Sequence, residues 1–66
     1  MDTEVLLVKE KLGYRLLHGV LHLINGLRQS DEMTAVASGE GKVKVVKTKD
    51  GILVGDGRQK MPLLFN

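Results

Sequence analysis

The first half of the chain carries a helical spacing of apolar residues. On a wheel of about 100° per residue, the apolar side chains fall in one sector and the polar ones in the opposite sector. The apolar set is Leu12, Leu16, Val20, Leu23 and Leu27, extended by Leu17, Leu21 and Ile24, and the polar set is Lys11, Arg15, His18, His22, Asn25 and Gln29. The pattern predicts an amphipathic helix from about Gly13 to Asn25, ending where Gly26 suits the left-handed position after a helix.

The apolar sector of this predicted helix covers about half of the circumference, which is wider than the roughly 100° that a surface helix needs. A chain of 66 residues without cysteine also has a thin margin of stability, because domains below roughly 70–80 residues usually need disulfides, a metal or a partner. The excess apolar surface therefore favours a homo-oligomer. Its expected interface is Leu16, Val20, Leu23 and Leu27.

The residues before Gly13 do not continue the helical pattern, because Lys9 would fall in the middle of the apolar sector. The segment from Glu4 to Glu10 is rich in branched side chains and favours a short strand. The alternative is one long helix that begins at Thr3 and is capped by Asp2 or Thr3.

After Gln29 the pattern changes to short apolar runs separated by glycine turns, which is typical of strands. The runs span residues 34–38, 42–48, 52–54 and 61–65. Connections of two or three residues predict antiparallel neighbours, and Asp50-Gly51 is a strong hairpin signal. Pro62 lacks an amide hydrogen, so the last run is expected at a sheet edge or beyond it.

These elements predict a single α+β domain over residues 1–66. One amphipathic helix packs on a three- or four-stranded antiparallel β-meander, with a short strand before the helix as an open alternative.

The charge is unevenly distributed along the chain. Residues 1–33 hold four Lys or Arg and five Asp or Glu, whereas residues 34–66 hold six and three, so a net charge of +2 divides into −1 and +3. The basic residues of the second half are Lys42, Lys44, Lys47, Lys49, Arg58 and Lys60. A basic ribbon suits the phosphate backbone of DNA or RNA. The alternative is a solvated sheet face whose lysines discourage edge pairing.

The alternation of a strand limits how many of these lysines share a face. Lys42 and Lys44 point to the same side, and Lys47 joins them only if a bulge occurs at Val45-Val46. No aromatic residue lies between the cations, so a stacking platform for single strands is not expected.

Metal and cofactor sites are not expected. His18 and His22 have the i, i+4 spacing that places two imidazoles on one helical face, with Asp31, Glu32 or a symmetry mate as a third ligand. Lys11 and Arg15 share that face and would repel a cation. The glycines around Ser38–Lys42 lack the spacing of a phosphate loop and are interpreted as turns.

Catalysis is not expected either, because no serine or threonine has a His-Asp pattern nearby and no carboxylate lies in an apolar segment. The longest apolar stretch, Leu16–Leu27, is too short and too polar for a bilayer, which takes about 20 residues. No secretory leader is visible, and the absence of cysteine fits a cytoplasmic setting.

The sequence thus predicts a small non-enzymatic regulator that binds DNA or RNA through its basic hairpin. The alternative is a protein-binding module or inhibitor that uses the helix face, a sheet edge or the apolar segment from Met61 to Asn66.

Overall fold

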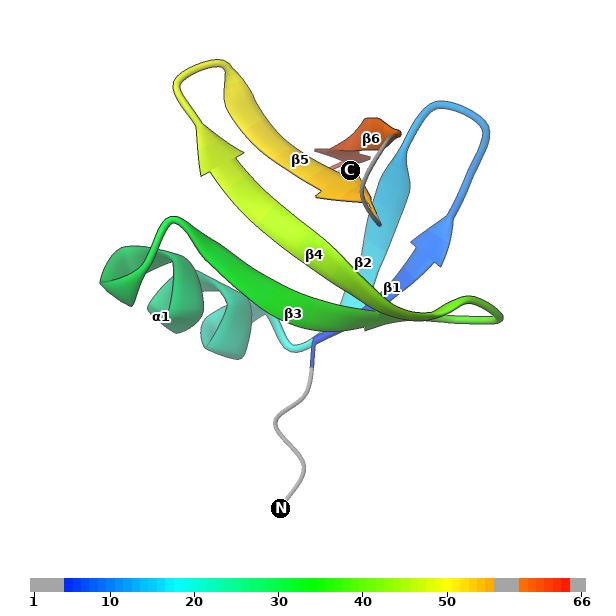
Figure 1. Ribbon diagram of the computed structural model, residues 1–66. Helices are drawn as coiled ribbons and strands as arrows, with labels where there is room; N and C mark the ends of the chain where they lie inside the picture. The colour runs from blue at the N-terminus through cyan, green and yellow to red at the C-terminus, as the bar shows by residue number, and fades with distance from the viewer. Residues whose placement is uncertain (1–4, 56–58, 65–66) are drawn as a thin grey trace.

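The computed structural model describes residues 5–55 and 59–64, and within them six strands form a closed barrel with one helix (Figure 1). Around the barrel the strands follow the order β1, β2, β6, β5, β4, β3. The elements are β1 (Leu6–Lys9), β2 (Tyr14–His18), α1 (Val20–Gln29), β3 (Glu32–Ala37), β4 (Gly41–Thr48), β5 (Gly51–Gly55) and β6 (Lys60–Leu64).

Two antiparallel units supply the wall of the barrel. One is the β1–β2 hairpin, and the other is the meander from β3 to β6, in which each strand pairs antiparallel with the next. The predicted meander over the second half of the chain is therefore confirmed, with four strands close to the four apolar runs.

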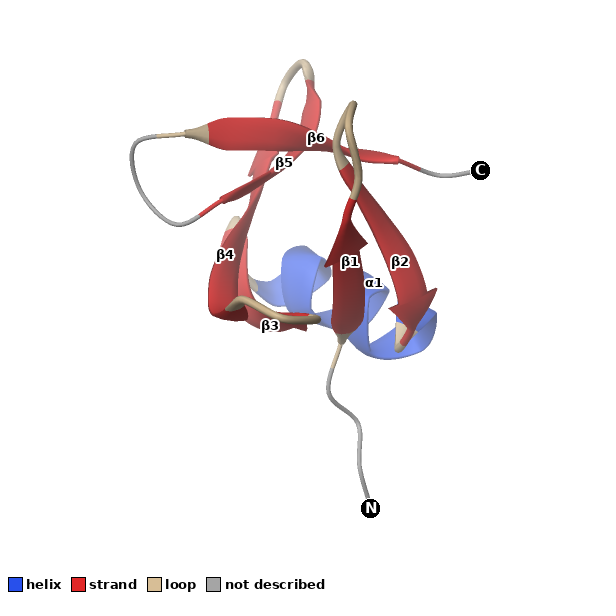
Figure 2. Ribbon diagram, turned by 90° about the vertical axis from the view of Figure 1, so that its right-hand side faces the viewer, coloured by secondary structure: helices blue, strands red, loops and turns tan. Residues whose placement is uncertain are grey.

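Two short parallel ladders join the hairpin to the meander. β1 pairs with β3 through Leu6↔Val36 and Leu7↔Ala37, and β2 pairs with β6 through Tyr14↔Leu63 and Arg15↔Leu64. In Figure 2, β6 runs across from β5 to β2 and completes the wall. Each strand of the closed barrel therefore has two neighbours.

The core is built mostly from small and branched side chains that alternate along the strands. Its buried members are Val5, Leu7, Tyr14, Leu23, Leu27, Ala35, Ala37, Val43, Val45, Val54 and Leu63. Small residues on β3 and β4 let the strands curve closely around one another, since successive strand residues point alternately in and out. On β4 this alternation buries Val43 and Val45 and leaves Lys42 and Lys44 exposed.

The predicted helix on one face of an open three- or four-stranded sheet is wrong. The segment Tyr14–His18, which was expected to be helical, is strand β2, and α1 begins only at Val20. Gly19 separates the two elements with a φ of 97°, in the left-handed region that favours glycine. The wide apolar sector on the helical wheel combined a strand and a helix, because Leu16 belongs to β2.

The end of α1 also differs from the prediction. The helix continues through Asn25-Gly26 to Gln29, and the amide of Ser30 donates to the carbonyl oxygen of Gly26 at 3.1 Å. Gly26 lies against the side chain of Met33 on β3, so its lack of a Cβ permits close packing. Among the described residues, no helix is long and apolar enough to cross a membrane.

The two remaining predictions about the strands have opposite outcomes. The strand interpretation of the segment before Gly13 is confirmed by β1, and the long-helix alternative is wrong for the described part of that segment. The placement of Pro62 on a sheet edge is wrong, because β6 lies between β5 and β2. Pro62 pairs with Leu53 of β5, and the ladder to β2 begins one residue later, at Leu63.

We expect Leu7→Ala to destabilise the protein by about 2–5 kcal/mol, because Leu7 is fully buried and the truncation leaves a cavity. Leu12→Ala removes the same atoms from a side chain that is 74% exposed and is the matched control, with an expected change within about 0.5 kcal/mol. Urea denaturation followed by circular dichroism measures both. Equal free energies of unfolding for the two variants would contradict the barrel core.

Candidate functional site

A groove on the outer wall of the barrel gathers three of the six predicted cations. Lys44 of β4 and Lys60 of β6 lie on either side of Gly55 of β5, because the register pairs Lys44 with Gly55 and Gly55 with Lys60. Gly55 has no side chain, and the carbonyl oxygen of Gln59 lies where its Cβ would be, so the glycine lets the start of β6 approach β5 closely between the two lysines. The groove has a volume of about 540 Å³, and its lining is Glu32, Thr34, Lys42, Val43, Lys44, Val46 and Lys60. We call it the lysine groove.

The residues that line the lysine groove have a net positive charge. Glu32 is its only acidic lining residue among those the structure describes, against Lys42, Lys44 and Lys60. Glu32 Oε1 lies 3.6 Å from Lys44 Nζ, and both side chains are more than half exposed. An exposed pair of this kind contributes little to stability and is readily exchanged for another anion. The groove therefore suits an anionic ligand.

The other predicted cations do not join this groove. The β4–β5 register runs without a shift from Lys44↔Gly55 to Thr48↔Gly51, so the bulge that would have turned Lys47 to the same side does not occur. Lys47 lies opposite Ile52, which packs against the core, and so belongs to the other face of the strand. Lys49 lies in the β4–β5 turn, and Arg58 lies outside the described residues.

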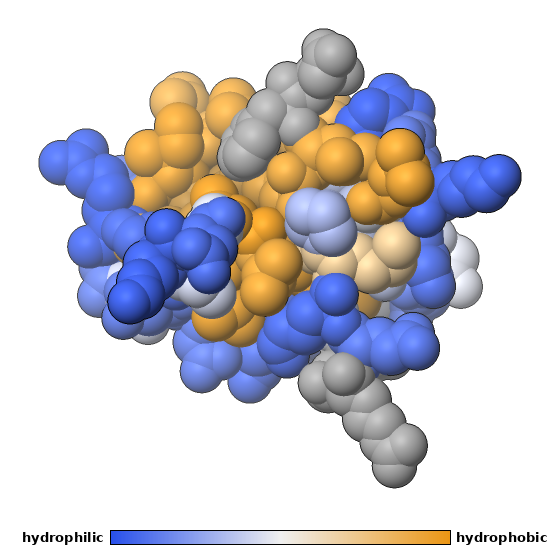
Figure 3. Space-filling view, turned by 90° about the horizontal axis from the view of Figure 1, so that it is seen from above, coloured by the Kyte–Doolittle hydropathy of each residue, from blue (hydrophilic) through white to orange (hydrophobic). Residues whose placement is uncertain are grey.

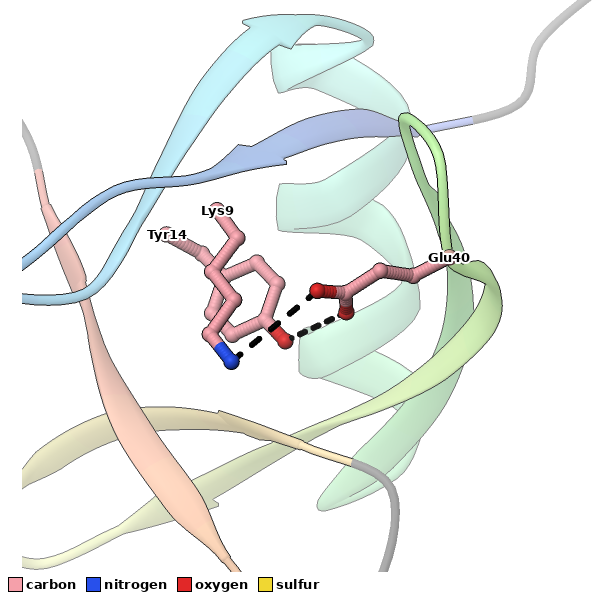
Figure 4. A network of polar contacts seen from close by, with 3 residues as sticks. All are labelled: Lys9, Tyr14 and Glu40. Atoms are coloured by element: carbon pink, nitrogen blue, oxygen red, sulfur yellow. Dashed lines mark hydrogen bonds and ion pairs between the residues drawn. The ribbon is translucent and has the colours of Figure 1, made fainter.

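A second hollow lies at the end of the barrel where β1 ends and β2 begins. It has a volume of about 330 Å³ and is lined by Lys9, Tyr14, Glu40, Gln59 and Met61. We call it the barrel-end pocket. The Tyr14 hydroxyl donates to Glu40 Oε1 at 2.8 Å, and Lys9 Nζ lies 4.0 Å from Glu40 Oε2 (Figure 4).

Backbone geometry brings Glu40 to this pocket. Glu40 lies in the turn between β3 and β4, flanked by Gly39 and Gly41 with φ of 82° and 88°. Its amide donates to the carbonyl oxygen of Ala37 at 2.9 Å, which closes the turn. Sequence reasoning treated this segment only as a turn and missed the pocket. The sequence feature that could have indicated the pocket was a single carboxylate, Glu40, with a glycine on each side.

The four residues expected at an oligomer interface are distributed differently. Leu23 and Leu27 are buried in the core of their own chain, Leu16 packs against that core, and Val20 is half exposed. The exposed apolar side chains near α1 are instead Leu17, Val20, Leu21 and Ile24. The homo-oligomer stays a prediction. The exposed set, and not the four residues first expected, is the apolar surface that a second copy of the chain would contact.

A further apolar area lies over β5, β6 and the β1–β2 turn (Figure 3). Leu53 and Pro62 are neighbours across the β5–β6 ladder, and Leu64 lies beside Gly13. Leu12 of the adjacent turn is 74% exposed.

His18 and His22 do not share a helical face. His18 is the last residue of β2 and His22 lies in α1, with Gly19 and the change of element between them. Within residues 5–55 and 59–64, no group of three or more His, Cys, Asp or Glu side chains is placed to hold a metal ion.

Comparisons of the chain with protein-family models, with curated proteins and with solved structures found no match. The lysine groove and the barrel-end pocket are therefore judged by their own chemistry.

We expect Tyr14→Phe to lower the free energy of unfolding by about 1 kcal/mol, because the variant keeps the buried ring and loses the hydroxyl that donates to Glu40. Chemical denaturation measures the change. Thr34→Val removes an exposed hydroxyl from β3 and serves as the control. A Tyr14→Phe variant as stable as the parent would show that this hydrogen bond contributes nothing net.

Proposed function

We propose that the protein is a binding module, not an enzyme, and that it engages the phosphate backbone of nucleic acid through the lysine groove. The observation that carries the proposal is the alignment of Lys44 and Lys60 across Gly55, with Lys42 on the same side of β4. The three cations line one hollow of the outer wall although they come from two strands that are not neighbours.

Phosphate is the anion that best fits this arrangement. Lysine ammonium groups bind phosphate oxygens as point charges on flexible stems, and each neutralised phosphate releases condensed counterions. Thr34 adds a hydroxyl to the lining. Contacts to the backbone fix position without reading sequence, so the groove alone predicts binding that tolerates many sequences. A regulatory role would then require a second element for selectivity.

The proposal is tested by fluorescence anisotropy with a random duplex and a random RNA at about 50 and about 200 mM salt. Three phosphate contacts on duplex DNA predict a slope of log K against log[salt] of about −2.7, or about 40-fold weaker binding at the higher salt. Lys42→Glu/Lys44→Glu should weaken binding at least about tenfold at the lower salt and flatten the slope towards about −1.

The matched control is Lys47→Glu/Lys49→Glu, which changes the net charge from +2 to −2 by the same four units but alters residues outside the groove. We expect it to retain most of the binding. Equal losses in the two double variants would mean that net charge alone drives the association. A parent protein that binds neither probe at about 50 mM salt would refute the proposal.

A second candidate function is protein binding by self-association through α1. Four large apolar side chains at the end of β2 and in the first half of α1 are 45% to 75% exposed: Leu17, Val20, Leu21 and Ile24. An exposed apolar cluster is typical of an interaction surface. A second copy of the chain is the occupant we consider, because a domain of this size gains stability from a partner.

Sedimentation equilibrium tests this candidate. A dimer would have twice the 7.3 kDa mass of the chain, and Leu21→Gln/Ile24→Gln should return it to the monomer mass. Leu12→Gln alters an equally exposed leucine in the β1–β2 turn and should leave the dimer intact. A monomeric parent at high concentration would count against self-association.

A further inference from the structure

The barrel-end pocket and the lysine groove are lined by neighbouring stretches of the chain. Gln59 and Met61, which line the pocket, are the chain neighbours of Lys60, which lines the groove. Glu40 of the pocket precedes Lys42 of the groove by two residues. Successive residues of a strand point to opposite faces, so the groove on the outer wall and the pocket at the barrel end adjoin at the rim, where β4 and β6 begin. A nucleic-acid strand that crosses this rim could place a phosphate in the groove and a base in the pocket.

Glu40 retains capacity to accept hydrogen bonds. A carboxylate offers about four acceptor positions on its two oxygens. The Tyr14 hydroxyl occupies one of them on Oε1 at 2.8 Å, and it fixes the direction of the carboxylate. Lys9 Nζ lies 4.0 Å from Oε2, which is an ion-pair distance and too long for a hydrogen bond. A ligand with two adjacent N–H donors can therefore approach both oxygens.

Hydrogen-bond donors lie beside this carboxylate. Lys9 and Gln59 line the same pocket, and a lysine ammonium and a glutamine amide can both donate to a carbonyl oxygen. Met61 and Tyr14 supply apolar surface to the pocket, and thioethers adapt well to flat ring systems. The pocket volume of about 330 Å³ lies at the small end of the range for small-molecule sites.

We infer that the barrel-end pocket binds an unpaired guanine base, with Glu40 accepting from N1–H and N2–H₂ and with Lys9 or Gln59 donating to O6. This inference rests on the proposed function, because it names the base that accompanies a backbone held in the lysine groove. It also makes the preferred ligand a single-stranded nucleic acid, since the Watson–Crick edge of guanine is accessible only when the base is unpaired.

Guanine is selected over the other bases by the order of donors and acceptors on its edge. It presents two neighbouring donors and then an acceptor, which matches a carboxylate beside an ammonium or amide. Adenine, cytosine and uracil each present at most one donor position on that edge, so they would leave one oxygen of Glu40 facing a ring acceptor or nothing. An acceptor that loses its water without gaining a partner weakens binding.

The test uses nucleosides, which carry no phosphate and so do not depend on the groove. Guanosine, inosine, adenosine, cytidine and uridine are titrated into the full chain and followed by amide chemical shifts. We expect guanosine to bind at least about tenfold more tightly than adenosine, cytidine and uridine, and to shift the amides of Lys9, Glu40 and Met61. Inosine lacks the N2 amino group and should bind several-fold more weakly than guanosine.

Glu40→Gln should weaken guanosine binding at least about tenfold and abolish the difference between guanosine and inosine, because an amide cannot accept from both donors. Glu10→Gln is the matched control. It neutralises a carboxylate that is also paired with a cation, Arg15, outside the pocket, and it should leave guanosine binding unchanged. If Glu40→Gln fails to fold, Lys9→Met is the second variant and Lys11→Met is its control. Lys9→Met should bind guanosine more weakly than Lys11→Met does.

The outcomes separate this inference from the proposed function. Guanosine binding without salt-dependent binding of oligonucleotides would support the pocket and refute the groove. Salt-dependent binding without any preference for guanosine would support the groove and refute the pocket. Chemical shifts that map to residues away from Lys9, Glu40 and Met61 would also overturn the inference, whatever the affinity.

Discussion

Closure of the barrel by the parallel ladders β1–β3 and β2–β6 is the constraint on which the rest of the structure depends. Each ladder is short, with two residue pairs, yet together they join a hairpin to a four-stranded meander. Parallel pairing requires a long crossover between the paired strands. The crossover from β1 to β3 runs through β2 and α1, and α1 buries Leu23 and Leu27. Closure also removes the unpaired edges through which a small sheet would associate.

The meander was predictable because its signals are local. Glycine turns and alternating valines between residues 34 and 55 specify strands and antiparallel neighbours within a few residues of each other. Strand β2 was not predictable in this way, because its apolar residues also fit a helical period. Leu16 stands four residues before Val20 and seven before Leu23, so a wheel joins them. The left-handed Gly19, the antiparallel pairing of β2 with β1, and the pairing of Tyr14 with Leu63 define β2 as a strand. The last of these is a long-range contact, 49 positions along the chain (63 − 14).

The candidate sites also differ in how much of their geometry follows from local sequence and how much from long-range pairing. That Lys42 and Lys44 share a face follows from the alternation of a strand. The register across Gly55 places Lys60 beside these two lysines and Lys47 on the other face of the strand. The barrel-end pocket depends on a longer separation still, because Tyr14 and Glu40 are 26 residues apart. Charge counting ranks Lys47 and Lys49 equal to Lys42 and Lys44, whereas barrel geometry distinguishes them.

The inward register of β1 explains why a polar pocket forms at the end of an apolar barrel. Val5, Leu7 and Lys9 follow one another at steps of two, and the first two are buried. Lys9 takes the third position where the barrel opens, so its aliphatic stem can follow the wall while its ammonium stays near water. An ammonium near an apolar wall is stabilised by a nearby carboxylate, which Glu40 provides from the β3–β4 turn. The same alternation that fills the core with valine and alanine therefore places a cation, a phenol and a carboxylate together at its rim.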